Sequence, residues 1–253
     1  MKFSVCTTNY QCEHALERHL ESVYQNLKDF DFEYIVVDNK SKDRSLGILK
    51  RWESKHSNMK VFSERCTIGE GRNISFEKSS GKFIIVMDTD VVYYKETSRF
   101  LEIYLEKYAD LAVQAIMLGV FPRNIWREIR GRRSLNVFED VDMWIRIWEL
   151  CRMRWYPVLM GENVKNPSTV GRYDFLSKRY SKRERVIRLL RKEYDLLKTR
   201  KIRKLDLERI WNDNLVDFGL GELQNEWFKN YPKMSPAENV KRLGRQIKQT
   251  LKG

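Results

Sequence analysis

Two carboxylates, Asp88 and Asp90, stand one residue apart where the short apolar run from Phe83 to Met87 ends. A run this short and rich in β-branched residues is typical of a strand buried on both faces of a parallel sheet. Two carboxylates at the end of such a strand can both reach one divalent cation, or one can hold a hydroxyl group or a metal-bound water. Their oxygen atoms favour Mg²⁺ or Mn²⁺. Because this spacing also arises by chance in surface turns, its position after a buried strand is what supports a metal site.

A second acidic cluster, Glu139 and Asp140, lies in "NVFEDVDMWIRIWEL". The apolar residues there follow helical spacing: Phe138, Val141, Trp144, Ile145 and Trp148. The two acids therefore fall near the first turn of a helix, where the helix dipole favours negative charge. One interpretation is an ordinary acidic helix start. The other is that Asp140 is a general base that faces a binding pocket.

The elements that must position these residues alternate along the chain. Strand-like runs cover residues 2–7, 34–37, 60–62 and 83–87, and segments with helical periodicity separate them. One such segment has apolar residues at Leu16, Leu20, Val23 and Leu27. This alternation predicts an α/β fold with a mostly parallel sheet and helices on both faces. A further strand is expected within residues 111–118.

Polar clusters occur beside the carboxyl ends of the predicted strands, at residues 7–10, 38–45, 69–73 and 88–90. Since those ends share one edge of a parallel sheet, we expect the clusters to converge on one pocket. Taken alone, Asp38 and Ser41 would also fit turn and helix N-cap positions. The convergence of all the clusters favours a binding site.

Composition limits the class of protein. A chain of 253 residues, 42% of them hydrophobic, can bury a full core and favours one large domain with an appendage. The longest nearly apolar stretch, residues 111–121, is too short to cross a bilayer, and the first ten residues lack signal-peptide features. We therefore expect a cytoplasmic location. The cysteines have neither metal-site nor disulfide spacing, which predicts reduced thiols, some of them in the core.

The positive charge is concentrated in one segment. Residues 177–204 contain 13 lysines and arginines and 3 acidic residues, an excess of +10 within a total of +13. This distribution indicates a near-neutral body with a cationic extension, and no nucleic-acid partner is expected.

The extension also has amphipathic helical patterns. An apolar stripe runs through Ile187, Leu190, Tyr194 and Leu197, and a capping box at residues 235–238 precedes a second stripe. Two interpretations stay open. The helices pack on the main domain, or they bind an anionic membrane surface, which would place the protein on the inner face of the cell membrane.

The motifs together resemble those of inverting glycosyltransferases of family 2. The matching segments, in order, are "SVCTTNY", "YIVVDNKSKDRS", "GEGRNISFEKSSGKFIIVMDTD" and "FEDVDMWIRIW", which cover roughly residues 1–150. Their order and spacing are far more specific than any one of them. The resemblance implies a GT-A fold, which is Rossmann-like, with the basic C-terminal helical extension added. It divides the chain into a nucleotide-sugar-binding half (1–90), an acceptor-side half (91–175) and the extension (176–253).

The resemblance also implies roles for individual residues. Asp140 would be the catalytic base, and Asp88 and Asp90 would hold Mg²⁺ or Mn²⁺. Binding of the nucleotide-sugar donor would involve Thr7, Thr8, Asn9, Asp38, Arg72, Asp88, Thr89 and Asp90. Thr7 and Asp38 would contact the base. Two positions depart from the family pattern: Asn9-Tyr10 reverses the usual Tyr-Asn, and Asn39 replaces a second Asp.

The implied function is metal-dependent transfer of one sugar from a nucleoside-diphosphate sugar, with UDP preferred over GDP, to a hydroxyl of a glycan or lipid-linked acceptor. Processive members carry Gln-x-x-Arg-Trp, whereas this chain has Cys151 before Arg154-Trp155, which favours single-sugar transfer. Two other classes stay open: a catalytically silent nucleotide-sugar-binding protein, and a nucleic-acid-binding protein that uses the basic segment.

Overall fold

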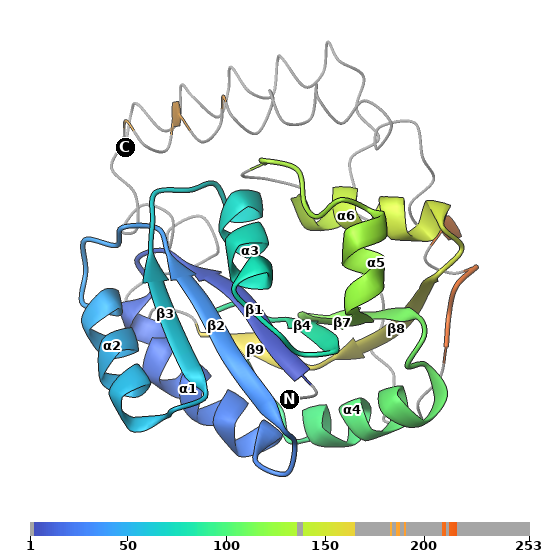
Figure 1. The fold of residues 1–253 in the computed structure, drawn as a ribbon, viewed down its shortest axis with the longest axis horizontal. Coiled ribbons are helices and arrows are strands. Elements are labelled where there is room, and N and C mark those ends of the chain that lie inside the picture. Colours follow the sequence, from blue (N-terminus) through green and yellow to red (C-terminus); the bar gives the residue numbers. More distant parts are fainter. Residues whose placement is uncertain are drawn as a thin grey trace.

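The protein is described from a computed structural model that covers residues 3–135 and 139–164, with residues 183, 186–187, 190, 209–210 and 213–216. The strands are β1 (Phe3–Asn9), β2 (Phe32–Asp38), β3 (Met59–Ser63), β4 (Phe83–Val86), β5 (Val91–Tyr93), β6 (Ala112–Ile116), β7 (Leu118–Pro122), β8 (Met153–Leu159) and β9 (Gly161–Asn163). The helices are α1 (Glu13–Leu27), α2 (Ser45–Lys55), α3 (Ile68–Glu77), α4 (Glu96–Lys107), α5 (Arg123–Glu128) and α6 (Glu139–Glu149) (Figure 1).

Within the described residues, seven strands form one sheet in the order β3-β2-β1-β4-β7-β6-β8. β1 pairs in parallel with β2 and β4, and β2 pairs in parallel with β3. β7 runs antiparallel to both β4 and β6. The predicted α/β fold with a mostly parallel sheet is confirmed. β5 and β9 form a separate antiparallel pair just after Asp90.

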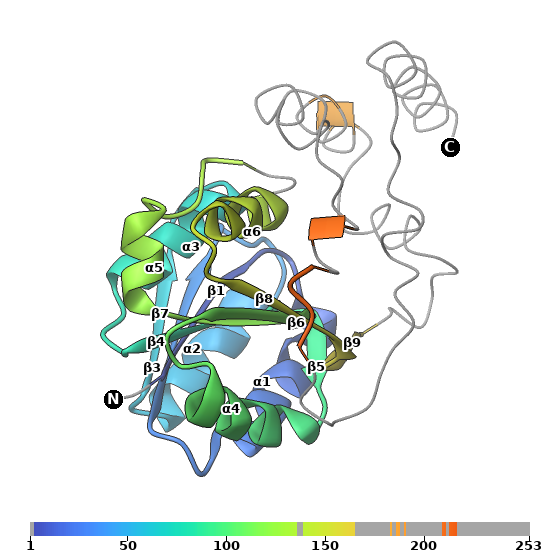
Figure 2. The same cartoon turned by 90° about the vertical axis from the view of Figure 1, so that its right-hand side faces the viewer.

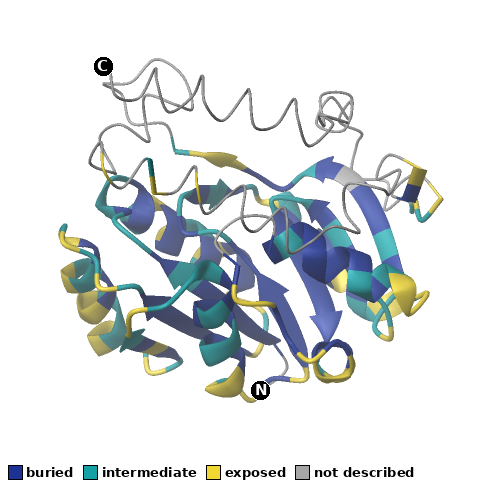
Figure 3. Cartoon of the chain, turned by 90° about the horizontal axis from the view of Figure 1, so that it is seen from above, coloured by how far each residue is buried: buried dark blue, intermediate teal, exposed yellow. Residues whose placement is uncertain are grey.

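The helices cover both faces of the sheet, as Figures 1 and 2 show. Side chains that alternate along a strand point to opposite faces, and each face has its own core. Leu16 of α1, Leu49 of α2 and Phe100 of α4 belong to one core cluster. Phe76 of α3, Trp126 of α5 and Trp144 of α6 belong to the other. The central strands are buried, and exposed residues lie on the outer sides of the helices (Figure 3).

The expected single strand within residues 111–118 is instead a hairpin. β6 ends at Ile116, and β7 starts at Leu118 and returns antiparallel, with Val113 opposite Val120. Met117 makes the turn at φ 73°, a left-handed conformation that is unusual for a residue with a side chain. The reversal makes β7 finish at the edge of the sheet opposite the site, so α5 and the segment after it run back toward the site.

Gly119 on β7 allows a close approach of α6. A Cβ atom at this position would lie 2.5 Å from Cζ2 of Trp144, which real Cβ contacts do not tolerate. Trp144 is buried and packs edge-on against Phe121. The helix that carries Glu139 and Asp140 is therefore seated directly on the sheet.

Two further sequence predictions concern the C-terminal extension and the cysteines. Most of the predicted extension, including most of residues 177–204 and all of 235–251, lies outside the described residues. Cys6 and Cys12 are buried, which confirms that some cysteines fill the core, and burial raises the pKa of Cys6 to about 12. In the part of the chain that the structure describes, no helix combines the length and apolarity that a membrane span needs.

Candidate active site

The ends of β1 and β2 meet through Asn9 and Asp38, which are partners in the strand register. Nδ2 of Asn9 donates to Oδ1 of Asp38 at 2.8 Å, and both residues are buried. The main-chain N–H of Ser41 donates to Oδ2 of Asp38 at 2.9 Å, and its hydroxyl donates to Oδ1 at 2.6 Å. Asp38 therefore stabilises the turn after β2, as one interpretation of the sequence expected. Its contact with a nucleotide base stays a prediction.

The threonines of the rim tie β1 to the end of β4. The hydroxyl of Thr7 donates to the carbonyl of Met87 at 2.6 Å, and Thr7 is fully buried. Oγ1 of Thr89 lies 3.5 Å from the carbonyl of half-buried Thr8. The predicted donor-binding segments at the ends of β1 and β4 are thus neighbours. The Thr7 hydroxyl therefore already has a hydrogen-bond acceptor within the protein. Its contact with the donor stays a prediction.

Asp88 is held in place by two neighbours. Its carboxylate forms an ion pair with Nη2 of Arg72 on α3, and its main-chain N–H donates to the hydroxyl of Tyr93 at 2.9 Å. That hydroxyl donates in turn to the carbonyl of Met117 at 3.0 Å, so the turn of the β6–β7 hairpin supports the site. Asp90 is half-buried, and its carbonyl accepts a hydrogen bond from Val164 at 2.8 Å.

Local sequence explains how α3 brings Arg72 to this rim. Thr67 caps the helix, and Thr67 and Glu70 form a capping box with reciprocal hydrogen bonds. Gly71 lets the first turn approach β1, because a Cβ atom there would lie 2.3 Å from Cγ2 of Thr8. The next residue, Arg72, is therefore buried between the helix and the end of β4.

The two acids at the start of α6 have different environments. Glu139 is buried and accepts a hydrogen bond from Nη1 of buried Arg132 at 3.2 Å. Burial, and secondly the charge of Asp140, raise the pKa of Glu139 to about 7, although Arg72 and Arg132 act in the opposite direction. Asp140 is only half-buried, and its Oδ1 accepts from the N–H of Val141 at 2.8 Å. Asp140 is thus the more accessible of the two acids.

Asp142, the third acid of this helix, is engaged in ion pairs. Its carboxylate oxygens lie 3.0 Å from Nη1 of Arg133 and 2.9 Å from Nη2 of Arg146, and the Asp142 side chain is buried. Arg146 also donates to the carbonyls of Ile129 and Gly131. Asp142 therefore stabilises the segment before α6 and is a poor candidate for the base.

The acids of α6 and the pair on β4 form one electrostatic cluster around Arg72. Burial lowers the pKa of Arg72, but Asp88, Glu139 and Asp140 together raise it above the usual value. Burial, and secondly the positive charge of Arg72, lower the pKa of neighbouring Arg132 to about 10. Residues of the clusters at 69–73 and 88–90 therefore lie together, and the acids at the start of α6 lie near enough to act on them.

The residues present fit a divalent cation that shares its ligands with a substrate. The Asp88 side chain is 46% exposed, so it remains accessible although Arg72 pairs with it. In the described segments, no group of three or more His, Cys, Asp or Glu side chains could hold a metal ion by itself. Mg²⁺ is usually bound by one or two carboxylates together with substrate phosphates and water. Asp88 and Asp90 match such a partial set of ligands.

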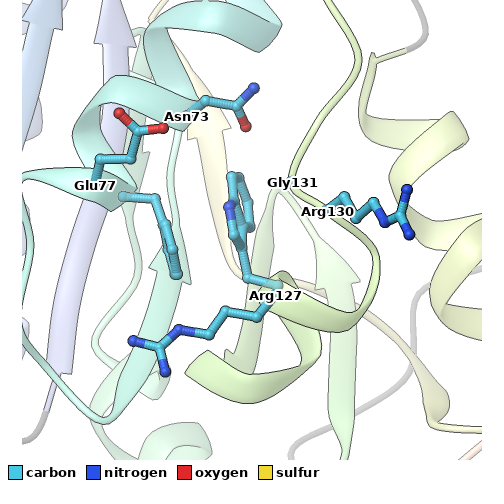
Figure 4. Close-up of a pocket in the computed structure, with 7 residues that line it drawn as sticks. Asn73, Glu77, Arg127, Arg130 and Gly131 are labelled. Atoms are coloured by element: carbon cyan, nitrogen blue, oxygen red, sulfur yellow. The ribbon is translucent and has the colours of Figure 1, made fainter.

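A pocket of about 220 Å³ lies between α3 and α5 (Figure 4). Its lining residues are Asn73, Phe76, Glu77, Trp126, Arg127, Arg130 and Gly131. None of the predicted site residues is among them. Figure 4 shows the side chains of Arg127 and Arg130 extending in opposite directions, so their guanidinium groups do not converge on one ligand.

Sequence reasoning missed Arg132, Asn73 and Tyr93. Arg132 lies in "GRRS", where nothing in the spacing separates it from exposed Arg133. Asn73 is the last residue of the cluster at 69–73, but its partners lie far along the chain. The only signal for Tyr93 was its place three residues after Asp90.

A sequence model described as "Glycosyl transferase family 2" matches residues 4–158, more than half of the chain. Among curated proteins, the chain is similar to the poly(ribitol-phosphate) beta-N-acetylglucosaminyltransferase TarS of Staphylococcus aureus, with 29% identity over 129 residues. It is also similar to a poly(ribitol-phosphate) beta-glucosyltransferase of Bacillus spizizenii, with 33% identity over 96 residues. The matches cover 49% and 36% of this chain, but only 22% and 15% of those relatives.

Solved structures share the fold. A mannosyltransferase from Pyrobaculum calidifontis in complex with GDP-Man and Mn²⁺ aligns with a TM-score of 0.58 at 17% identity, over 75% of this chain and 61% of that one. S. aureus TarS residues 1–349 in complex with UDP-GlcNAc aligns with a TM-score of 0.56 at 17% identity, over 76% and 66% of the two chains.

Proposed function

Because the chain belongs to glycosyl transferase family 2 and has the GT-A fold, we propose that it is an inverting, metal-dependent glycosyltransferase. It moves one sugar from a nucleoside-diphosphate sugar to a hydroxyl group of an acceptor. The observation that carries this proposal is the ion pair between buried Arg72 and Asp88 at the end of β4, with Asp140 at the start of α6 near enough to raise the pKa of the same arginine.

The chemistry requires two kinds of carboxylate, and the cluster supplies both. Asp140 takes the proton from the acceptor hydroxyl as its oxygen attacks the anomeric carbon, and the configuration inverts. Such general-base help is typically worth about 10²–10⁴-fold in rate. Asp88 and Asp90 would hold Mg²⁺ or Mn²⁺, which when bound stabilises negative charge on the departing diphosphate. Arg72 places a permanent positive charge beside the same phosphates.

We propose that the donor is a UDP sugar in preference to a GDP sugar. The TarS structure holds UDP-GlcNAc and the archaeal mannosyltransferase holds GDP-Man, so the fold accepts both. TarS and the Bacillus enzyme are relatives with sequence similarity, and the TarS complex supports UDP. Both relatives are named for poly(ribitol-phosphate), which supports a glycan acceptor. We propose that this acceptor is lipid-linked.

A lipid-linked acceptor requires contact with a membrane. We propose that the protein is cytoplasmic and attaches peripherally to the inner face of the cell membrane through residues 177–204, whose excess of +10 suits anionic lipid. Most of that segment lies outside the described residues.

One experiment tests the donor. Thermal shift is measured against UDP, GDP and their sugars, each with and without Mn²⁺, followed by hydrolysis of every sugar nucleotide that binds. We expect stabilisation by UDP sugars that requires the metal, and slow hydrolysis. Binding without any hydrolysis or transfer would indicate a catalytically silent binding protein. A salt-dependent shift of DNA or RNA that survives loss of Asp88, with no nucleotide binding, would indicate a nucleic-acid-binding protein.

A further inference from the structure

The segment between α5 and α6 is anchored to α3 by its main chain. Nδ2 of Asn73 donates to the carbonyl of Arg132 at 2.8 Å, and the N–H of Arg132 donates to Oδ1 of Asn73 at 2.8 Å. One turn earlier on α3, Glu70 accepts from the hydroxyl of Ser134 at 2.6 Å. The main chain of Arg132 thus has a fixed position relative to α3.

Asn73 is the residue next to Arg72, which pairs with Asp88. Two adjacent side chains of one helix therefore reach the two sides of the site. Arg72 pairs with Asp88 at the end of β4. Asn73 donates a hydrogen bond to the main chain of Arg132, whose side chain pairs with Glu139 of α6.

In the part of the chain that the structure describes, the Arg132 side chain pairs with Glu139. Its Nη1 donates to Glu139, with 1% of the Arg132 side chain and 9% of the Glu139 side chain exposed. Nε and Nη2 of Arg132 are buried without a hydrogen-bond partner. A buried guanidinium that satisfies so few of its donors is unfavourable for stability alone, since such charges normally need full pairing. An ordinary packing role does not explain this arrangement well.

Among the described residues, four charged groups act on Glu139. Asp140 on its own helix and Asp88 after β4 disfavour a second negative charge. Arg72 on α3 and Arg132 on the preceding segment favour it. Of the two arginines, Arg72 has the larger effect on the pKa of Glu139, and Arg132 is the one that also donates a hydrogen bond to that carboxyl.

We propose that Arg132 is a positioning residue that keeps Glu139 ionised beside Asp140, and that Asn73 fixes it relative to Arg72. The inference rests on the proposed glycosyl transfer. An ionised Glu139 favours arrival of the acceptor proton on Asp140, because a neighbouring negative charge stabilises that proton. A protonated Glu139 gives no such help. Arg132 itself touches neither the donor nor the acceptor.

The first test measures Glu139 directly in the substrate-free protein. The carboxyl is followed by ¹³C NMR in protein with labelled glutamate, and the signal is assigned by its loss in Glu139→Gln. Its midpoint in the wild type is expected near pH 7. In Arg132→Gln we expect the midpoint to rise by about one pH unit or more. Arg132→Lys, which keeps the charge, should restore part of the shift. Arg127→Gln, a change of an exposed arginine on α5, should have no effect.

The second test is functional and uses UDP-GlcNAc hydrolysis with Mn²⁺ as the probe reaction. In Arg132→Gln the acidic limb of the pH profile of kcat should move to higher pH by the same amount as the Glu139 midpoint. The Kd for UDP should stay within about twofold of wild type. Glu139→Gln should lower kcat similarly, and the double variant should be no slower than either single one.

The outcomes separate this inference from the proposed function. An unmoved Glu139 midpoint, an unmoved acidic limb, or a loss of UDP affinity as large as the loss of kcat would each overturn the role of Arg132. Should Arg132→Gln fail to fold, Asn73→Ala tests the same point, since loosening Arg132 should shift the midpoint in the same direction, and no shift overturns the proposal. Failure of the wild type to bind any sugar nucleotide would instead overturn the glycosyltransferase assignment.

Discussion

The guanidinium of Arg72 and the carboxylate of Asp88 form an ion pair in which 8% of the arginine side chain and 46% of the aspartate side chain are exposed. The arginine is therefore fixed inside the protein, whereas its partner faces solvent at the rim of the sheet. An arriving cation can reach Asp88 without displacing a buried group.

The proposed metal site predicts the effect of removing the charge of Asp88 or of Asp90. Asp88→Asn or Asp90→Asn should weaken Mn²⁺-dependent UDP binding by about tenfold or more, because an amide lacks the charge that holds a dication beside a diphosphate. Calorimetric titration with and without Mn²⁺ checks this. Asp29→Asn, a change of an exposed residue after α1, is the control. Unchanged metal dependence in both variants would show that the pair is not the metal site.

Asp140 and Asp142 should respond to the same substitution in different ways. Asp140→Asn is expected to lower transfer by about 10²–10⁴-fold, since it removes the base, while UDP affinity stays near wild type. Single-turnover assays and UDP titration measure the two effects. Transfer at a near wild-type rate would mean that another group is the base.

Asp142→Asn should instead lower the free energy of unfolding by about 1–3 kcal/mol, because Arg133 and Arg146 lose a charged partner. Chemical denaturation measures this change. An Asp142 variant that is fully stable but inactive would contradict the structural role assigned to Asp142.

The raised pKa of Glu139 predicts that the stability of the protein depends on pH. Its pKa is raised from 4.5 to about 7 in the folded protein. A carboxyl with a raised folded-state pKa contributes stability that is fully present below the unfolded pKa and is lost as pH rises through the folded pKa. The loss should amount to about 3 kcal/mol between pH 4.5 and 7. Glu139→Gln should abolish this loss in denaturation curves, and Glu77→Gln, a change of an exposed acid on α3, should retain it.

Two helical glycines should respond oppositely to alanine. A Cβ atom at Gly69 would lie 2.1 Å from the carbonyl oxygen of Arg133, whereas one at Gly47 would meet nothing within 4 Å. Gly69→Ala should destabilise the protein by about 1–3 kcal/mol, since the segment that carries Arg132 must shift. Gly47→Ala should stabilise it by up to about 1 kcal/mol. Equal effects in thermal unfolding would show that the segment is not tightly held.

The basic segment predicts binding to anionic membranes. Each basic residue near an anionic leaflet can contribute about 1 kcal/mol, so residues 177–204 should bind anionic but not neutral liposomes. Binding in co-sedimentation should fall as salt rises and weaken when Arg185, Arg188, Arg191 and Lys192 are changed to Gln. A wild-type protein that stays in the supernatant at low salt would leave the segment as a packing or partner-binding element.

The sequence predicted the elements whose patterns are local. The strand before Asp88 and the helix after Phe138 were found because their apolar periods reflect burial on a sheet and on a helix face. The hairpin was missed because Met117 makes its turn at φ 73° with no Gly or Asn to mark it. Because apolar residues continue from β6 through the turn into β7, the sequence pattern does not show where the chain reverses direction.

The candidate site was predictable to the same degree. Asp88 and Asp90 follow a recognisable strand, so their place at the edge of the sheet could be derived from strand order, whereas the role of Asp140 came from the family resemblance. The pairing of Arg132 with Glu139 could not, because it depends on how a segment without regular structure folds against α3. Likewise, the hydrogen bond from Thr7 to Met87 depends on the rotamer that the Thr7 side chain adopts where β1 and β4 end.

The close contact between Gly119 and Trp144 has a consequence for variants of this protein. A Cβ atom at position 119 would lie 2.5 Å from Cζ2 of Trp144, so an alanine there requires Trp144 or the helix that carries it to shift. Asp140 lies at the start of the same helix. A substitution on β7, outside the candidate site, can therefore act on the proposed base through the packing of α6.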